Sequence, residues 1–170
     1  HLEQRQAQQA AHRQFRARCI GERQEIMAWT NFTFPGRNKK YSELEWHWWH
    51  FSATDRNMYN QEMKAVFLFD EKSFGEEDPA EGNVDYLMGC NIDTKNPDVR
   101  QELFYWGEWY LETTGIDGFR IDAMKHLEFD FMIEWIKHLR SKTDKKLYAV
   151  GEYWTGHSEA IDQFIQITDG

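Results

Sequence analysis

The chain has 170 residues, a formal net charge of −9 (20 basic and 29 acidic side chains) and 41% hydrophobic residues. A chain of this length forms one domain or pieces of two, and its apolar content is sufficient for a folded core. The acidic balance argues against nucleic-acid binding, which needs a basic surface. The sequence has no apolar run of the roughly 18 residues that a membrane span requires, so we expect no membrane insertion.

Aromatic residues make up 16% of the chain and include eight Trp. Indole rings stack on the flat faces of sugar rings, although many of these rings will also belong to a core. Cys19 and Cys90 are too few to predict a disulfide framework. The segment from His1 to Arg18 is rich in Gln and Arg and lacks the apolar stretch of a signal peptide, and the sequence indicates no cellular compartment.

Between Ile20 and Asn96 the sequence predicts a small, irregular, mostly antiparallel β region. Short alternating runs such as Glu45 to Phe51 are typical of strands, and turn dipeptides such as Pro35-Gly36 and Asp78-Pro79 interrupt them. The acidic stretch from Phe74 to Glu81 is interpreted as a solvated surface loop to which we attach no function.

From residue 96 onward the pattern predicts alternating helices and strands, and therefore a parallel sheet. Asn96 is a suitable N-cap, Pro97 fits the first helical position, and Gly115 supplies the C-terminal stop. The apolar positions of this first helix are Val99, Leu103, Trp106 and Tyr110. A second helix over Phe129 to Arg140 has the apolar positions Phe129, Ile133, Ile136 and Leu139, and a third, weaker helix covers residues 158–167.

Two acidic residues stand at the ends of the two strand-like segments of this half. Asp122 closes the segment that begins at Gly118, and Glu152 follows the apolar run that begins at Leu147. Because the C-terminal ends of neighbouring parallel strands share one rim, we expect the two carboxyls to lie side by side, where barrel enzymes keep their catalytic groups. Two adjacent carboxylates are the minimum for glycoside hydrolysis. The alternative is that either acid caps the helix after its strand.

Four segments resemble the α-amylase family of glycoside hydrolases. Gly118 to His126 closely resembles the strand-four motif of that family, and Gly151 to Trp154 resembles its strand-five motif. Asn83 to Met88 is similar to the calcium-binding part of the domain inserted into the barrel of bacterial liquefying-type and related intracellular amylases. Trp29 to Arg37 also resembles these proteins. The resemblance runs from about Phe15 to the C-terminus, with the four segments in the family's order.

The resemblance implies part of a (β/α)8 TIM barrel plus an irregular, mostly antiparallel β inserted domain. Residues 1–95 would be the inserted calcium-binding domain, in part, and residues 96–170 the part of the barrel that carries two catalytic strands. The chain would begin inside the inserted domain and stop after strand five. Because the family's Asp-x-x-x-x-Asn-His and Asn-His-Asp motifs, the latter with a third catalytic aspartate, are absent, we expect these 170 residues alone to be inactive.

The resemblance implies retaining endo-hydrolysis of α-1,4-glucosidic bonds in starch or glycogen-type glucans, with Asp122 as nucleophile and Glu152 as general acid/base. Arg120 lies two residues before Asp122 on the same strand, so both side chains point to one face. A guanidinium there would keep Asp122 ionised, as a nucleophile must be. Glu152 follows an apolar strand and precedes two aromatic residues, so partial desolvation would keep it protonated, as an acid catalyst must be.

Substrate contacts are implied for three further residues at the same rim. The resemblance implies that Lys125 and His126 hydrogen-bond sugar hydroxyls and that Trp154 stacks on a sugar ring near the cleavage point. Taken alone, Lys125 and His126 are more typical of a solvated loop, and Trp154 is equally typical of core packing.

Calcium is the cofactor that the resemblance implies. This ion takes six to eight oxygen ligands, and the matching positions are the side chains of Asp85 and Asn91 and the backbone carbonyl of His126. Many relatives have Asp where this chain has Asn91, so we expect a lower affinity. Asp93 would serve a second metal seen in some relatives, but Ser52 stands where another acidic ligand is expected, which argues against that second metal.

Two other functions remain open from the sequence. One is another member of the same family, such as a maltooligosaccharide-forming or transglycosylating enzyme. The other is a non-catalytic carbohydrate-binding protein on the same fold, which should have lost Asp122 or Glu152. A purely structural module would leave the strand-end acids and the many Trp residues without a purpose. The sequence indicates neither the product length nor the oligomeric state.

Overall fold

The computed structural model describes residues 2–10, 20–38, 40–63, 65–73 and 86–168, and for residues 2–10, 20–21 and 167–168 it describes the backbone alone. The described residues fall into two compact units, one within residues 1–74 and 86–99 and the other within residues 100–170. The acidic stretch from Phe74 to Glu81 and the predicted calcium ligand Asp85 lie outside the described residues.

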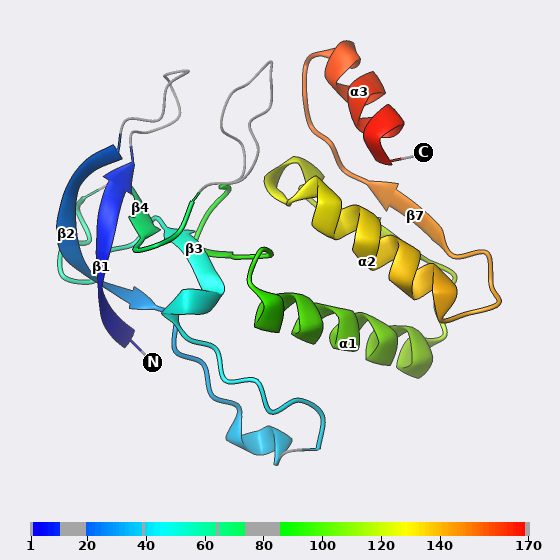
Figure 1. Ribbon diagram of the computed structural model, residues 1–170, viewed down its shortest axis with the longest axis horizontal. Coiled ribbons are helices and arrows are strands. Elements are labelled where there is room, and N and C mark those ends of the chain that lie inside the picture. Colours follow the sequence, from blue (N-terminus) through cyan, green and yellow to red (C-terminus); the bar gives the residue numbers. More distant parts are fainter. Residues whose placement is uncertain (1, 11–19, 39, 64, 74–85, 169–170) are drawn as a thin grey trace. The chain divides into compact units, whose positions relative to one another are not determined.

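The first unit contains a five-stranded sheet with the strand order β2-β1-β4-β3-β5 (Figure 1). Its strands are β1 (Leu2–Ala10), β2 (Ile20–Trp29), β3 (Phe51–Thr54), β4 (Val66–Phe69) and β5 (Cys90–Ile92). All described pairings are antiparallel, as the sequence predicts. The 3-10 helices η1 (Pro35–Arg37) and η2 (Trp48–His50) lie in its connections. Strand β1 was not predicted, because its Gln-rich sequence shows no alternation of apolar and polar residues.

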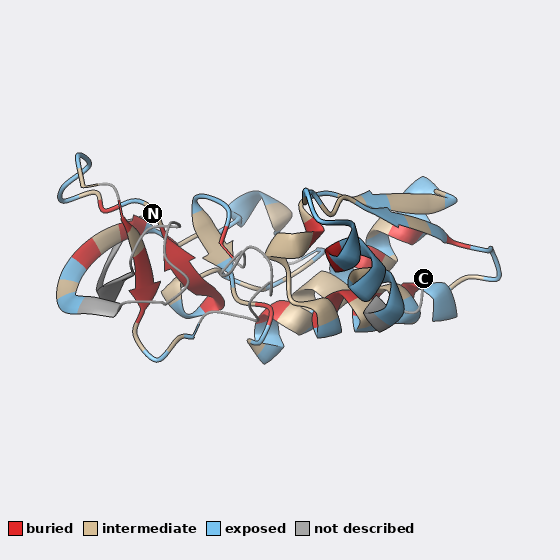
Figure 2. Ribbon diagram, turned by 90° about the horizontal axis from the view of Figure 1, so that it is seen from above, coloured by how far each residue is buried: buried red, intermediate tan, exposed pale blue. Residues whose placement is uncertain are grey.

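The core of this unit lies on both faces of β3 and β4, which Figure 2 shows as buried. On one face Phe67 and Phe69 pack with Ile26 and Phe51, and the half-buried rings of Phe32, Trp46 and Trp48 pack against this cluster. On the other face Leu68 packs with Ala53 and Tyr86. Part of the high Trp content is therefore core, which was one of the two uses considered for it.

The second unit alternates helices with strands, as predicted. Its elements are α1 (Pro97–Thr114), β6 (Gly118–Ile121), η3 (Met124–His126), α2 (Phe129–Ser141), β7 (Tyr148–Gly151) and α3 (Ser158–Thr168). Strands β6 and β7 pair in parallel. The described residues thus form a mixed α/β structure with two parallel strands and without a closed barrel. None of the described helices is both long and apolar enough to cross a membrane.

The ends of α1 are fixed by the residues that the sequence indicates. The side-chain oxygen of Asn96 accepts hydrogen bonds from the backbone N–H of Asp98 (2.9 Å) and Val99 (3.3 Å), which confirms it as the N-cap. Gly115 has a positive φ of 63°, a conformation that glycine adopts without steric cost, and its N–H donates to the carbonyl of Leu111 at 2.9 Å.

The buried face of α2 differs from the predicted one. The residues buried on this helix are Phe131, Met132, Trp135 and Leu139, of which the periodicity predicted Leu139 alone. Trp135 sets the orientation, because its ring lies close to Gly107 of α1 and its Nε1–H donates to the carbonyl of Leu103 at 3.0 Å. Phe129 packs against Phe164 of α3, with ring centroids 5.1 Å apart.

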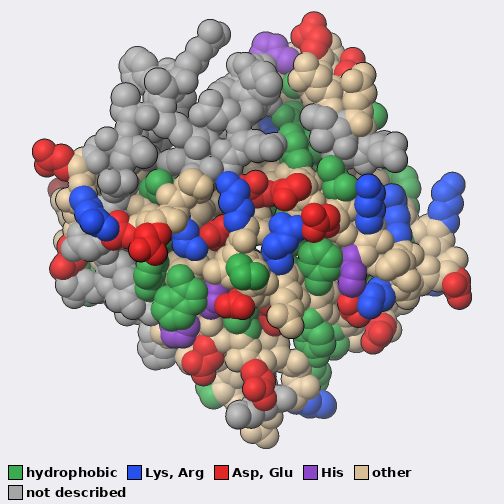
Figure 3. Space-filling model, viewed as in Figure 1, with side chains coloured by type: hydrophobic (Ala, Val, Ile, Leu, Met, Phe, Trp, Pro, Cys, Tyr) green, Lys and Arg blue, Asp and Glu red, His purple; other side chains and the backbone are tan. Residues whose placement is uncertain are grey.

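Charged side chains of both signs are interspersed among the described residues on one face of the molecule. On the face shown in Figure 3, Lys and Arg lie among Asp and Glu, in keeping with the net charge of −9. The described residues on this face therefore present no continuous basic patch of the kind that binds nucleic acid.

Candidate active site

The pairing of β6 with β7 places the two strand-end acids at one rim. The register runs from Gly118 opposite Tyr148 to Ile121 opposite Gly151, and Asp122 and Glu152 are the next residues of their strands. The Glu152 N–H donates to the carbonyl of Ile121 at 2.8 Å, which continues the pairing past the strand ends. Both acids thus lie at the same end of adjacent parallel strands, the arrangement expected from the sequence.

Arg120 joins the two carboxyls. Its Nη1 lies 2.6 Å from Asp122 Oδ1, and its Nη2 lies 3.4 Å from Glu152 Oε2. Glu152 Oε2 also accepts a hydrogen bond of 3.3 Å from the backbone N–H of Ala123, the residue after Asp122. Ala123 has a φ of 51°, so the chain turns sharply just after the acid. One guanidinium and one backbone amide therefore orient both acids.

The electrostatics favour an ionised Asp122. The hydrogen bond from Arg120, and after it a hydrogen bond with Glu152, hold the pKa of Asp122 below its usual value. The side chains of Arg120 and Asp122 are 61% and 72% exposed, so the ion pair adds little to the stability of the fold. Glu152 is 41% exposed, and the described residues do not supply the desolvation on which its acid role was predicted.

A buried methionine packs directly beneath this rim. Met124, two residues after Asp122, is 6% exposed, and its N–H donates to the carbonyl of Glu152 at 2.9 Å. A Cβ atom added to Gly151 would lie 1.6 Å from Met124 Sδ, far inside van der Waals contact. Sequence reasoning missed this contact, although a glycine within an apolar strand often marks a close approach.

We expect Gly151→Ala to destabilise the full-length protein by about 1–3 kcal/mol, because the new methyl group overpacks against Met124. The matched control is Gly156→Ala, since a Cβ there meets nothing within 4 Å. Urea unfolding of the two variants, and of Gly151→Ala in a Met124→Ala background, measures the effect. With Met124 replaced by Ala, the loss of stability caused by Gly151→Ala should largely disappear. If Gly151→Ala lowers the free energy of unfolding equally with Met124 present and with Met124→Ala, contact with Met124 is not the cause of the destabilisation.

The three predicted substrate-binding residues also lie near this rim. Lys125 and His126 belong to η3, directly after the turn at Ala123, and both are half-buried. Trp154, two residues after Glu152, is 80% exposed. Within the described residues Trp154 is therefore not part of a core, which was the alternative considered for it.

The predicted calcium ligands are not brought together by the described residues. Asp85 lies outside them, Asn91 belongs to the first unit and His126 to the second. The Asn91 Nδ2 donates to Ser52 Oγ at 2.9 Å, so its Oδ1 is the atom that would bind a cation. In the described ranges no three His, Cys, Asp or Glu residues cluster as they would around a metal.

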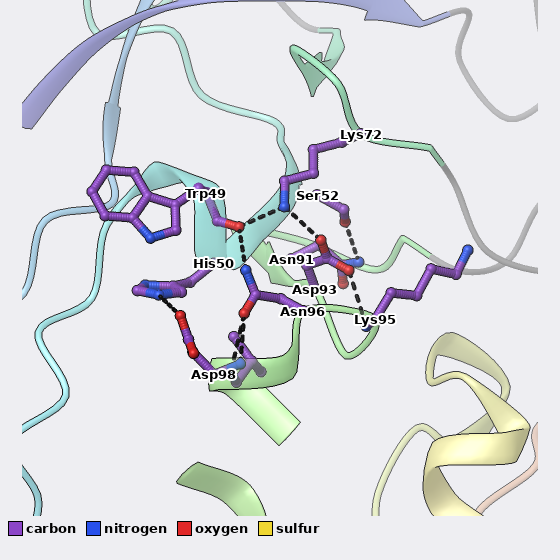
Figure 4. Close-up of polar contacts among 10 residues, drawn as sticks. Trp49, His50, Ser52, Lys72, Asn91, Asp93, Lys95, Asn96 and Asp98 are labelled. Atoms are coloured by element: carbon purple, nitrogen blue, oxygen red, sulfur yellow. Dashed lines mark hydrogen bonds and ion pairs between the residues drawn. The ribbon is translucent and has the colours of Figure 1, made fainter. Parts of the chain in front are cut away.

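Asp93, the residue predicted for a second metal site, accepts hydrogen bonds on both of its carboxylate oxygens. Its Oδ2 accepts a hydrogen bond from Lys72 Nζ at 2.7 Å, and its Oδ1 accepts one from the backbone N–H of Lys95 at 3.0 Å (Figure 4). An ammonium group on the same carboxylate opposes the binding of a second cation there.

The family described as "Alpha amylase, catalytic domain" matches residues 28–169. This chain belongs to the α-amylase family. It is 41% identical over 155 residues to an α-amylase from Bacillus licheniformis, a match that covers 91% of this chain and 30% of the relative. It is also 42% identical over 149 residues to a glucan 1,4-alpha-maltohexaosidase from Bacillus sp. strain 707. That match covers 85% of this chain and 28% of the relative.

The crystal structure of an Anoxybacillus α-amylase aligns with a TM-score of 0.48 and 26% identity, over 56% of this chain and 23% of that one. The chain thus spans about 30% of the length of the curated relatives that it matches.

Proposed function

We propose that the full-length protein is an α-amylase that hydrolyses internal α-1,4-glucosidic bonds of starch or glycogen-type glucans with retention of configuration. The observation that carries this proposal is the pair of strand-end carboxyls, Asp122 and Glu152, joined by the guanidinium of Arg120. The membership of the α-amylase family supports the choice of an α-glucan as substrate.

The chemistry needs one ionised and one protonated carboxyl. Asp122, kept ionised by Arg120, attacks the anomeric carbon while Glu152 gives its proton to the departing oxygen, and a covalent glycosyl-enzyme forms. Glu152 then removes a proton from the water that cleaves this intermediate. Two displacements at the same carbon give net retention. Arg120 contributes by fixing the charge and the orientation of both acids.

Exposed apolar side chains on β7 support a larger barrel around these strands. Parallel strands are normally covered on both faces, yet Tyr148 and Val150 are 67% and 44% exposed. We propose that residues 96–170 belong to a (β/α)8 barrel whose other strands and helices cover these positions. Residues 1–95 would then be the inserted β domain, and the antiparallel sheet of the first unit is consistent with this assignment.

Substrate binding is proposed for Lys125, His126 and Trp154. Lys125 and His126 would donate hydrogen bonds to sugar hydroxyls from the loop that follows the nucleophile. The exposed ring of Trp154 offers a flat apolar face beside Glu152 on which a sugar can stack.

Calcium is proposed to bind Asp85, the Oδ1 of Asn91 and the backbone carbonyl of His126. All three are hard oxygen donors, which is the ligand type that calcium prefers. The neutral amide of Asn91 adds no charge, so the affinity should be lower than with a carboxylate at that position.

A maltooligosaccharide-forming enzyme is the second candidate. The observation that favours it is the 42% identity to a maltohexaosidase, which is as high as the identity to the α-amylases. A non-catalytic carbohydrate-binding protein is less well supported, because both catalytic carboxyls are present and share one arginine.

We expect the full-length protein to shorten amylose with early release of mixed oligosaccharides whose new reducing ends are first in the α configuration. Proton NMR of the anomeric signals during the first minutes, with chromatography of the products, measures both properties. Initial β anomers would contradict the retaining mechanism. A single dominant product length from the start would support the second candidate instead.

A further inference from the structure

Lys72, whose side chain is partly buried, reaches into a joint formed by Trp49 of η2, Asp93 after β5 and Asn96 before α1. Lys72, just after β4, donates from Nζ to Asp93 Oδ2 at 2.7 Å and to the carbonyl of Trp49 at 2.5 Å (Figure 4). The side chains of Lys72 and Asp93 are only 14% and 12% exposed. We propose that the Lys72 ammonium takes the place of a metal ion in this joint. It neutralises the charge of Asp93, so that Asp93 binds no metal ion.

The oxygen atoms around Lys72 are already used. Asp93 Oδ1 accepts from the backbone N–H of Lys95 at 3.0 Å, and the Trp49 carbonyl accepts a second hydrogen bond, from Asn96 Nδ2, at 3.1 Å. A divalent cation at Asp93 would have to compete with Lys72 for Asp93 Oδ2. The cation would lie beside the partly buried ammonium group of Lys72, and charge repulsion in this poorly solvated position would oppose its binding.

Asn91 and Ser52, the two other residues of the first unit considered for metal binding, have neutral side chains. Asn91 Nδ2 donates to Ser52 Oγ at 2.9 Å, so this pair satisfies itself without a cation. Calcium requires six to eight oxygens, and tight sites include several carboxylates. Among Asp93, Asn91 and Ser52, Asp93 alone is a carboxylate, and its ion pair with Lys72 neutralises that charge.

The joint connects four segments of the first unit. Lys72 follows β4, Trp49 belongs to η2, and Asp93 follows β5. Asn96 completes the connection, because its amide nitrogen donates to Trp49 while its oxygen caps α1. Removing one partner of a buried ion pair leaves the other charge uncompensated. The joint should therefore lose stability when either Lys72 or Asp93 is neutralised, whatever the calcium concentration.

The test is a calcium titration of the full-length protein after chelation, together with its melting temperature in calcium and in chelator. Asp93→Asn should bind the same number of calcium ions as the parent, with a Kd within about twofold. Its melting temperature should fall by about 5 °C or more in both conditions. Asp85→Ala, the comparison variant, should lose calcium binding and with it the stabilisation by calcium. Asn91→Asp should tighten calcium binding.

Lysine variants complete the test. Lys72→Met should lower the melting temperature in chelator, whereas Lys146→Met, at an exposed lysine of the second unit, should leave it nearly unchanged. Loss of one calcium ion or a tenfold weaker Kd in Asp93→Asn would overturn the proposal. So would a stability loss in Asp93→Asn that vanishes in chelator. If Asp93→Asn does not fold, the Lys72→Met/Asp93→Asn double variant gives the same calcium measurement. No arm measures hydrolysis, so the result is independent of the proposed enzymatic function.

Discussion

Asp122→Asn is expected to lower kcat for glucan hydrolysis by about four orders of magnitude or more in the full-length protein, because an amide cannot form the glycosyl-enzyme bond. The measurement is the rate of new reducing ends from amylose, with binding of a maltooligosaccharide measured separately. Binding should stay largely intact, since the nucleophile acts in the transition state rather than in holding the substrate.

Asp117→Asn is the matched control for this variant. Asp117 precedes the same strand, β6, but its side chain is 90% exposed and pairs with Lys145 at 2.8 Å. Its substitution should leave kcat within about twofold of the parent, as is usual for an exposed ion pair. Near-normal turnover by Asp122→Asn, or an equal loss in Asp117→Asn, would show that Asp122 is not the nucleophile.

Glu152→Gln should lose nearly all activity on amylose but keep a fast first step on an α-maltosyl fluoride. Fluoride leaves without protonation, so the general acid is not needed to form the glycosyl-enzyme. The second step still needs Glu152 as a base, and the intermediate should accumulate. A burst of fluoride release, followed by a slow steady state, is the expected stopped-flow trace.

The leaving-group dependence separates the two acids. Asp122→Asn should release no fluoride burst, because the attack itself is lost. If Glu152→Gln is equally slow on amylose and on the fluoride, Glu152 is not the general acid. Normal activity of Glu152→Gln on amylose would contradict the assignment altogether.

Much of the second unit follows from local sequence. The cap at Asn96 and the stop at Gly115 bound α1 through backbone groups that lie within a few residues. The sequence predicts that the two strand-end acids lie together, because the C-terminal ends of successive parallel strands in β/α units lie at the same edge of the sheet. The two-residue spacing from Arg120 to Asp122 likewise predicts that both side chains share one face.

What could not be predicted depends on contacts between residues far apart in the chain. Two sets of apolar residues on α2 recur at helical spacing, so periodicity alone does not decide which set is buried. The contact of Trp135 with α1 decides it. The Lys72–Asp93 pair joins residues 21 positions apart, and a lysine beside turn residues is more typical of a solvated surface. Strand β1 is placed by its pairing with β2 and β4 rather than by an apolar pattern of its own.

The central claim is that Asp122 forms a covalent bond to the substrate while Glu152 serves as the acid and base. Its most direct test is mass spectrometry of the full-length Glu152→Gln variant after brief incubation with an α-maltosyl fluoride, followed by acid quench and peptide mapping. We predict a mass increase of one maltosyl group, located on the peptide that contains Asp122 and absent from Asp122→Asn/Glu152→Gln. A maltosyl group on any other residue, or none while fluoride is released in a burst, would contradict the account.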